Sequence, residues 1–244
     1  MENPEIDRTC ALFLDLDGTL VEIAETPDAV AVPPDLPPLL ARLRELLGGA
    51  LAIVSGRPIR DTDRLLAPLV TASSGEHGAA IRFPDGTVDE MRRDAHVPEG
   101  WKVRLGEQIA KWPGVLLETK PHGVTLHYRL APARATDVWD LARSLVTDDN
   151  PWFKLIPARM AVEIGLKSTD KARAVEQLMA HAPFRARVPF FVGDDFTDEA
   201  GMRAARELGG RGLRVGEVFG GKPAEVRAWL KRGVERLSRE AVTT

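Results

Sequence analysis

Two carboxylates, Asp15 and Asp17, stand one residue apart at the end of an apolar run and directly before Gly18. Alternation along a strand places both side chains on the same side of the chain. Two like charges this close repel each other, and burial raises that cost. A cation between them, or a proton on one of them, relieves the repulsion, and both solutions suit phosphoryl transfer. An Asp-Gly pair is also common turn chemistry, so the motif needs support from the rest of the chain.

Three further polar sites follow an apolar run or open a helix. Ser55 follows one such run, Lys171 lies at the start of an expected helix, and the pair Asp194 and Asp195 follows another run. The carboxyl ends of parallel strands lie along one edge of a sheet, so these groups can converge there. Each also has a simpler interpretation. Ser55 with Gly56 can form a turn, Lys171 can be a solvated helix residue, and either aspartate can cap a helix.

Together, these residue types suit the cleavage of a phosphate ester. A carboxylate can attack phosphorus and form an acyl phosphate, and a second carboxyl can protonate the leaving alcohol and later deprotonate water. Mg²⁺ takes oxygen ligands and offsets the charge of an acidic site that must bind an anion. A lysine and a hydroxyl stabilise the charge that develops in the transition state.

The elements that must position these groups alternate between strand and helix in the first and last parts of the chain. After the strand that precedes Asp15, strands are expected at residues 50–54, 70–73, 188–192 and 213–215, and a hairpin joins residues 79–83 to 87–91. Helices are expected from Asp35 to about residue 47, from Pro58, from a Ser168 cap to about residue 181, after Glu199, and after Pro223. This pattern predicts an α/β fold with a doubly wound, mainly parallel Rossmann-like sheet.

The middle of the chain has a different pattern. A helix at residues 98–112 precedes strands at 115–119 and 124–130, a helix at 132–146 and a strand at 152–156. This order is typical of an α+β layer. We therefore expect a catalytic core of residues 1–91 and 161–244, and an inserted α+β cap domain of residues 92–160 above the ligand edge of the sheet.

Composition limits the possible partners and the compartment. The formal net charge is −3, which gives no electrostatic case for nucleic acid or a membrane surface. The one cysteine, Cys10, cannot form an intrachain disulfide, which favours a reducing compartment. The first residues lack the features of a signal peptide, and no apolar run is long enough to span a bilayer. We expect a soluble cytoplasmic protein with no nucleic-acid or membrane partner.

At the motif residues, the sequence resembles the haloacid dehalogenase-like hydrolase superfamily, and within it the trehalose-6-phosphate phosphatases. Residues 15–19 (DLDGT), residues 55–57 (SGR), Lys171 and residues 193–199 (GDDFTDE) match its four motifs in order. The resemblance implies a haloacid dehalogenase-like core in which Asp15 is the nucleophile, Asp17 is the general acid and base, and Ser55 and Lys171 are catalytic.

The resemblance also implies a Mg²⁺ site. The metal would be bound by the side chains of Asp15 and Asp194 and by the backbone carbonyl of Asp17. Asp195 and Asp198 would then orient the metal-bound waters or the catalytic lysine.

Four shorter stretches, GEHG at 75–78, ETK at 118–120, LHYR at 126–129 and AVEI at 161–164, are similar to segments of the same enzymes. Strand alternation places Thr125, His127 and Arg129 on one face, where polar groups could bind sugar hydroxyls, although a solvated sheet face would show the same pattern. The candidate substrate-binding residues are Gly56, Arg57, Glu76, His77, Glu118, Lys120, His127, Arg129 and Glu163. The chain departs from the family at Ala172, where Gly is usual, and at residues 165–167, where a proline-containing variant is expected.

The resemblance implies a Mg²⁺-dependent phosphatase that hydrolyses trehalose 6-phosphate to trehalose and phosphate through an aspartyl-phosphate, with the cap closing to exclude water. Two alternatives remain open. The substrate could be another sugar phosphate, such as sucrose or glucosylglycerol phosphate. The chain could also be a non-catalytic module that binds a sugar phosphate, although all four motif groups that such a module is free to lose are present.

Overall fold

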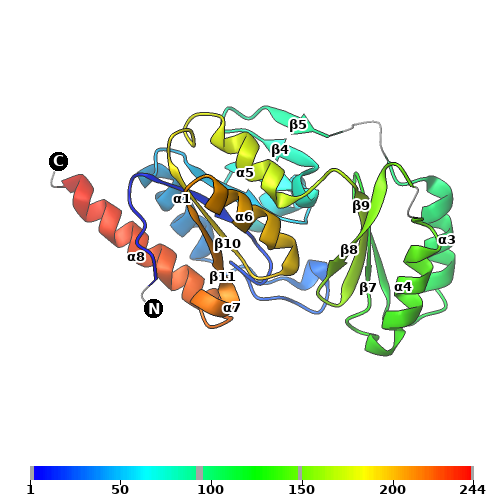
Figure 1. The fold of residues 1–244 in the computed structure, drawn as a ribbon. Coiled ribbons are helices and arrows are strands. Elements are labelled where there is room, and N and C mark those ends of the chain that lie inside the picture. Colours follow the sequence, from blue (N-terminus) through cyan, green and yellow to red (C-terminus); the bar gives the residue numbers. More distant parts are fainter. Residues whose placement is uncertain (1–2, 92–95, 148–149, 243–244) are drawn as a thin grey trace.

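The computed structural model describes residues 3–91, 96–147 and 150–242. Within these residues the strands form a seven-stranded sheet and a four-stranded sheet, which lie beside each other (Figure 1). We refer to them as the larger and the smaller sheet.

The larger sheet has the strand order β11-β10-β1-β2-β3-β4-β5. Pairing is parallel from β11 to β3 and antiparallel from β3 to β5. Its strands are β1 (Cys10–Leu14), β2 (Leu51–Val54), β3 (Ala72–Gly75), β4 (Ala80–Arg82), β5 (Val88–Glu90), β10 (Val188–Gly193) and β11 (Arg211–Arg214). The expected doubly wound, mainly parallel sheet is therefore confirmed.

Helices cover the larger sheet, with α1 packed on α8 and α5 packed on α6. These helices and turns are η1 (Pro27–Ala29), α1 (Leu36–Leu46), α2 (Ile59–Leu66), η2 (Glu76–Gly78), α5 (Lys171–Met179), η4 (Phe196–Asp198), α6 (Glu199–Glu207), α7 (Val215–Val218) and α8 (Pro223–Val242). In α1, the leucines at helical spacing, Leu36, Leu40 and Leu43, are fully buried. Every residue of β1 is buried, as expected for a parallel strand covered on both faces.

The smaller sheet is antiparallel, with the order β6-β7-β9-β8. Its elements are α3 (Glu99–Ile109), β6 (Leu116–Thr119), β7 (Val124–His127), η3 (Pro132–Arg134), α4 (Ala135–Arg143), β8 (Phe153–Ala158) and β9 (Ala161–Leu166). Helices α3 and α4 lie on the side of this sheet that faces away from the larger sheet (Figure 1). They close a second apolar core around Leu105, Val138 and Ile164. The opposite face of the smaller sheet is turned toward the larger one.

One expected boundary needs correction. The sequence pattern predicts that residues 161–244 belong to the core, but β9 pairs with both β7 and β8, so the chain returns to the larger sheet only after Leu166. All six residues of β9 are buried, a pattern that a strand of the larger sheet would also show. The expected start of the insert at residue 92 lies outside the described residues.

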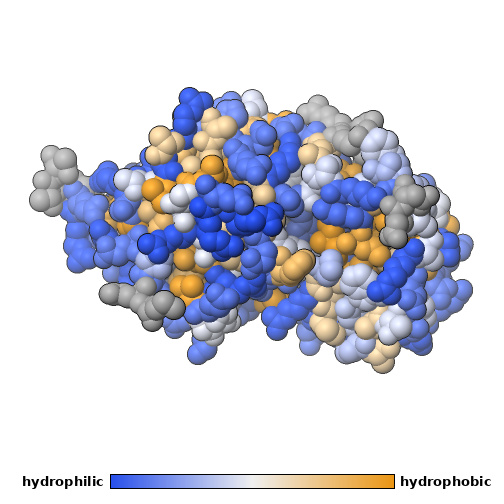
Figure 2. All heavy atoms as spheres, viewed as in Figure 1, coloured by the Kyte–Doolittle hydropathy of each residue, from blue (hydrophilic) through white to orange (hydrophobic). Residues whose placement is uncertain are grey.

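Two local expectations also differ. The cap of α5 is Asp170, whose side chain accepts a hydrogen bond from the backbone N–H of Arg173 at 3.2 Å, and not Ser168. Strand β3 begins two residues later than expected, because Val70 is exposed. No helix among the described residues combines the length and apolar character needed to cross a bilayer. Hydrophilic residues make up most of the face shown in Figure 2, with apolar residues in smaller patches between them.

Candidate active site

Three strands of the larger sheet carry the predicted catalytic groups to one edge. In the parallel register, Leu14 of β1 lies opposite Val192 of β10 and Ile53 of β2, so these strands end close to the same level. Asp15, Ser55 and Asp194 follow those ends, and the expected convergence of the motifs is observed.

Lys171, the first residue of α5, lies between two of the carboxylates. Its Nζ donates to Asp15 Oδ1 at 2.7 Å and to Asp198 Oδ1 at 2.6 Å, and all three side chains are buried. Burial opposes the charge of this lysine, but the two carboxylates raise its pKa above the ordinary value. Lys171 is therefore a fixed ammonium beside Asp15.

Asp15, Asp194 and Asp198 each offer a carboxylate oxygen, and these oxygens lie within 4.8 Å of one another. Burial, followed by the charge of Asp198, raises the pKa of Asp15 well above its ordinary value. Burial and the same neighbour raise the pKa of Asp194 to about 7. Asp198 already accepts from Lys171 and, through Oδ2, from the backbone N–H of Asp195 at 3.0 Å. An oxygen-only donor set with crowded negative charge fits a hard divalent cation such as Mg²⁺.

Gly18 allows the backbone to approach Asp194 closely. Its φ is +81°, a region that favours glycine, and a Cβ atom there would lie 2.2 Å from Asp194 Oδ2. The chain directly after Asp17 is therefore pressed against a carboxylate of the cluster. This contact supports the expectation that the Asp17 carbonyl and the Asp194 carboxylate could share one cation.

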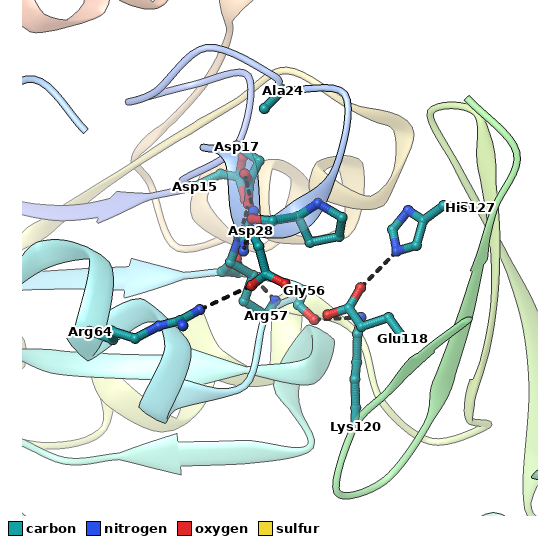
Figure 3. A network of polar contacts seen from close by, with 12 residues as sticks. Asp15, Asp17, Ala24, Asp28, Gly56, Arg57, Arg64, Glu118, Lys120 and His127 are labelled. Carbon is teal, nitrogen blue, oxygen red and sulfur yellow. Dashed lines mark hydrogen bonds and ion pairs between the residues drawn. The ribbon is translucent and has the colours of Figure 1, made fainter. Parts of the chain in front are cut away.

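Arg57 contacts Asp17 through two hydrogen bonds (Figure 3). Nε donates to Oδ2 at 2.6 Å, and Nη2 donates to Oδ1 at 2.8 Å. The backbone N–H of Arg57 also donates to Ser55 Oγ at 3.1 Å. Burial opposes the charge of the guanidinium, but Asp17 raises its pKa above the ordinary value. Arg57, expected to contact substrate, is thus a partner of the expected general acid.

The smaller sheet presents a polar face to this site. Glu118, Thr125 and Glu163 lie side by side on β6, β7 and β9 in the antiparallel register. Lys120 Nζ donates to Glu163 Oε2 at 2.5 Å and crosses to the backbone carbonyl of Gly56 at 2.8 Å. Figure 3 shows this lysine reaching from the smaller sheet toward the loop after β2.

Opposite charges keep this polar face ionised despite its burial. Burial favours the neutral form of Glu163, but Lys120 and His77 lower its pKa below the ordinary value. Burial acts in the same direction on Glu118, yet its hydrogen bond with His127, at 2.8 Å from Nε2 to Oε2, brings the net pKa below the ordinary value. His77 Nε2 lies 3.5 Å from Glu163 Oε2.

A cavity of about 160 Å³ lies between the two sheets at this point. The sequence-predicted residues that line it are Asp15, Asp17, Ser55, Gly56, Arg57, His77, Glu118, Lys120, His127, Arg129, Glu163, Lys171, Asp194, Asp195 and Asp198. The larger sheet and the elements packed on it supply the aspartates and Lys171, and the smaller sheet supplies the polar face.

Arg129 lies beyond the end of β7 and reaches across the junction of the sheets. It donates to the carbonyl of Ala24 and, at 3.0 Å, to that of Arg159. In this structure its guanidinium is therefore occupied by backbone groups at the rim of the cavity.

One sequence-predicted residue lies elsewhere. Glu76 is absent from the described residues that line the cavity, and its carboxylate binds His122 instead. Four polar lining residues, Thr26, Thr125, Arg159 and Thr197, lie outside the candidate set. Two of them carry a signal in the sequence: Thr125 shares a strand face with His127, and Thr197 lies within the motif at residues 193–199. Arg159 lies in the turn between β8 and β9, and Thr26 directly precedes η1, so neither has a local pattern that marks it.

Comparison with known proteins gives matches that agree with one another in the family they indicate. A family model described as trehalose-phosphatase matches residues 13–223. A probable trehalose-phosphate phosphatase of Sinorhizobium fredii (strain NBRC 101917 / NGR234) is 43% identical over 206 residues, which cover 84% of this chain and 77% of that protein. The trehalose-6-phosphate phosphatase of Escherichia coli (strain K12) is 37% identical over 215 residues, covering 88% and 80%.

Solved structures show the same fold. The C-terminal domain of a trehalose-6-phosphate phosphatase from C. albicans superposes with a TM-score of 0.77 at 17% identity, covering 96% of this chain and 98% of that one. A haloacid dehalogenase-like hydrolase from B. subtilis superposes with a TM-score of 0.59 at 12% identity, covering 94% and 99%.

Proposed function

The chain belongs to the trehalose-phosphatase family, and we propose that it hydrolyses trehalose 6-phosphate to trehalose and phosphate at the cavity between its two sheets. One observation supports the cavity as the site of this reaction. The aspartates at the edge of the larger sheet and Lys171 of α5 share one cavity with the polar face of the smaller sheet. The first group suits a phosphate, and the second suits the hydroxyls of a sugar.

We propose that Asp15 is the nucleophile. Its carboxylate oxygen attacks phosphorus, the bond between phosphorus and the sugar oxygen breaks, and an aspartyl-phosphate forms. Asp17 gives its proton to the leaving sugar oxygen and then takes a proton from the water that cleaves the acyl phosphate. Lys171, held 2.7 Å from Asp15, and the Ser55 hydroxyl stabilise charge on the transferred group.

We propose that Mg²⁺ is held by Asp15, Asp194 and the backbone carbonyl of Asp17. When bound, the ion would offset the negative charge that the carboxylates and the substrate bring together. Asp198 serves this site indirectly, because it fixes both Lys171 and the backbone of Asp195.

The smaller sheet with α3 and α4 is proposed to be a cap domain that binds the sugar. The side chains proposed for this role are Glu118, Lys120, His127 and Glu163, together with His77 of η2 and the backbone of Gly56. A cavity of about 160 Å³ is smaller than the roughly 300–1,000 Å³ of pockets that enclose ligands of comparable size. This difference supports the proposal that the cap moves away from the core to admit a disaccharide phosphate and closes afterwards.

A reducing, cytoplasmic compartment is part of the same proposal. The sole cysteine, Cys10, is buried in β1, where burial raises the pKa of its thiol to about 11. Such a thiol is unreactive and cannot pair within the chain. Cell fractionation would test this location.

The function is tested by phosphate release from trehalose 6-phosphate, sucrose 6-phosphate and glucosylglycerol phosphate, compared by kcat/KM. We expect the first to be preferred, and turnover to stop in excess EDTA and return with Mg²⁺. Asp15→Asn should abolish turnover without unfolding the protein, because Lys171 keeps Asp198 as a partner. If Asp15→Asn retained activity, Asp15 would not be the nucleophile. If the wild-type protein were fully active in excess EDTA, the reaction would not require the metal.

A further inference from the structure

A buried contact joins the two sheets just outside the cavity. Glu76 lies in η2, directly after β3, and His122 lies in the turn between β6 and β7. Glu76 Oε2 accepts from the backbone N–H of His122 at 2.8 Å, and Oε1 lies 3.1 Å from the ring Nδ1 of the same residue. Both side chains are about 95% buried. One carboxylate thus holds a residue of the other sheet at both its backbone and its ring.

The turn that Glu76 holds also carries Lys120. The backbone N–H of Lys120 donates to the carbonyl of Gly123 at 2.9 Å, which closes the turn around His122. From this position the Lys120 ammonium reaches Glu163 and the carbonyl of Gly56 inside the cavity. A shift of the turn would therefore move the Lys120 ammonium relative to the sheet edge that carries Asp15 and Ser55.

On the other side of the contact, the backbone around Glu76 is hydrogen-bonded to the loop of residues 55–57, which follows β2. The backbone N–H of Glu76 donates to the carbonyl of Arg57 at 3.1 Å, and that of His77 donates to the carbonyl of Ser55 at 3.2 Å. Glu76 and His77 have φ values of +48° and +55°. Left-handed backbone at residues other than glycine is unfavourable and persists only where the surroundings impose it. This strained turn directs the Glu76 carboxylate at His122 and the His77 ring at Gly56 and Glu163.

We propose that Glu76 and His122 are positioning residues, which fix the turn of residues 120–123 so that Lys120 can bind the sugar of the substrate. The inference rests on the proposed function. It assigns Glu76 a role that needs no contact with substrate, in keeping with its absence from the described lining of the cavity. The contact joins the core and the cap beside residues 55–57. It therefore sets the distance between the Lys120 ammonium and the proposed phosphate site.

The test compares Glu76→Ala, His122→Ala and Glu76→Gln on two substrates. Glu76→Ala removes both acceptors, so we expect KM for trehalose 6-phosphate to rise about tenfold while kcat changes less than about threefold. His122→Ala keeps its backbone N–H on Glu76 and should have a smaller effect. Glu76→Gln keeps one acceptor oxygen for that N–H and should recover most of the loss. For p-nitrophenyl phosphate, which has no sugar, kcat/KM should stay within about twofold of wild type in all three variants.

His181→Gln, at an exposed position near the end of α5, is the control for histidine replacement and should match wild type on both substrates. Unchanged KM for trehalose 6-phosphate in Glu76→Ala would overturn the inference. Equal losses on both substrates would also overturn it, because Glu76 would then support the core and not the sugar site. A wild-type protein that hydrolyses p-nitrophenyl phosphate but not trehalose 6-phosphate would overturn the proposed function, and this inference with it.

Discussion

Both carboxylate oxygens of Asp17 accept hydrogen bonds from the guanidinium of Arg57, at 2.6 Å to Oδ2 and 2.8 Å to Oδ1. The remaining terminal nitrogen, Nη1, donates to the carbonyl of Pro27 at 3.1 Å. A planar guanidinium with bonds on both sides holds a carboxylate in one orientation. The orientation of the proposed general acid therefore depends on Arg57, a residue that sequence reasoning assigned to substrate binding.

Replacing Arg57 by lysine tests this dependence. An ammonium keeps the positive charge but cannot donate to both oxygens in one plane. We expect Arg57→Lys to lower kcat for trehalose 6-phosphate about 10- to 100-fold, with a smaller change in KM. Arg60→Lys is the control, since Arg60 is exposed and its nearest carboxylate, on Asp61, is 3.8 Å away. A wild-type kcat in Arg57→Lys would show that Asp17 needs no such support.

The contact between Gly18 and Asp194 predicts a defect in metal binding. In Gly18→Ala, the new Cβ would overlap the Asp194 carboxylate and displace a proposed ligand. We expect the Mg²⁺ concentration for half-maximal activity to rise about tenfold or more. Gly86→Ala imposes a similar backbone strain, with φ at +88°, but nothing lies within 4 Å of the added atom. This control should lower thermal stability without changing the Mg²⁺ requirement, and an identical requirement in both variants would exclude the proposed role of Gly18.

Features encoded by local periodicity were predictable from the sequence. The helix at Leu36–Leu46 follows from leucines at helical spacing, and the strand at Cys10–Leu14 follows from its apolar run. The convergence of Asp15, Ser55 and Asp194 required only the general rule that parallel strands carry their ligands at one edge. The polar face with Glu118 and Lys120 was visible as strand alternation.

Contacts between distant segments were not predictable in this way. Arg57 lies 40 residues from Asp17, and His122 lies 46 residues from Glu76, and neither pair has a local signal. The domain boundary predicted at residue 161 is wrong because β9 is buried along its whole length, as a strand of the larger sheet would also be. In each case, tertiary packing selects one partner from several that are chemically equivalent.

The buried pair of Lys120 and Glu163 predicts that the stability of the fold and the KM for trehalose 6-phosphate can be changed independently. Lys120→Met leaves the buried Glu163 carboxylate beside Thr125 and His77 without its lysine partner, and we expect a loss of about 3–5 kcal/mol in stability. The double variant Lys120→Met, Glu163→Gln removes that unpaired charge and should recover much of the melting temperature. KM for trehalose 6-phosphate should remain raised in both. Lys111→Met, at an exposed site beyond α3, is the control, and a double variant no more stable than Lys120→Met would contradict the argument.

The contact between His122 and Glu76 predicts a pH-dependent contribution to stability. The hydrogen bond that the His122 ring donates to Glu76, together with the charges of Glu76 and Glu90, raises the pKa of His122 above its ordinary value of 6.5. The ring of His96 stacks on that of His122 with 6.3 Å between ring centroids. Because the folded state holds this proton more tightly than the unfolded chain, the added stability is complete below pH 6.5 and is lost as pH rises through the folded pKa. Melting temperatures of wild type and His122→Gln, measured from pH 6 to 9, should differ most at the acidic end and converge toward the alkaline end. The exposed variant His181→Gln should show no such convergence, and a difference between wild type and His122→Gln that grows with pH would show that the His122 ring does not bind Glu76 as a cation.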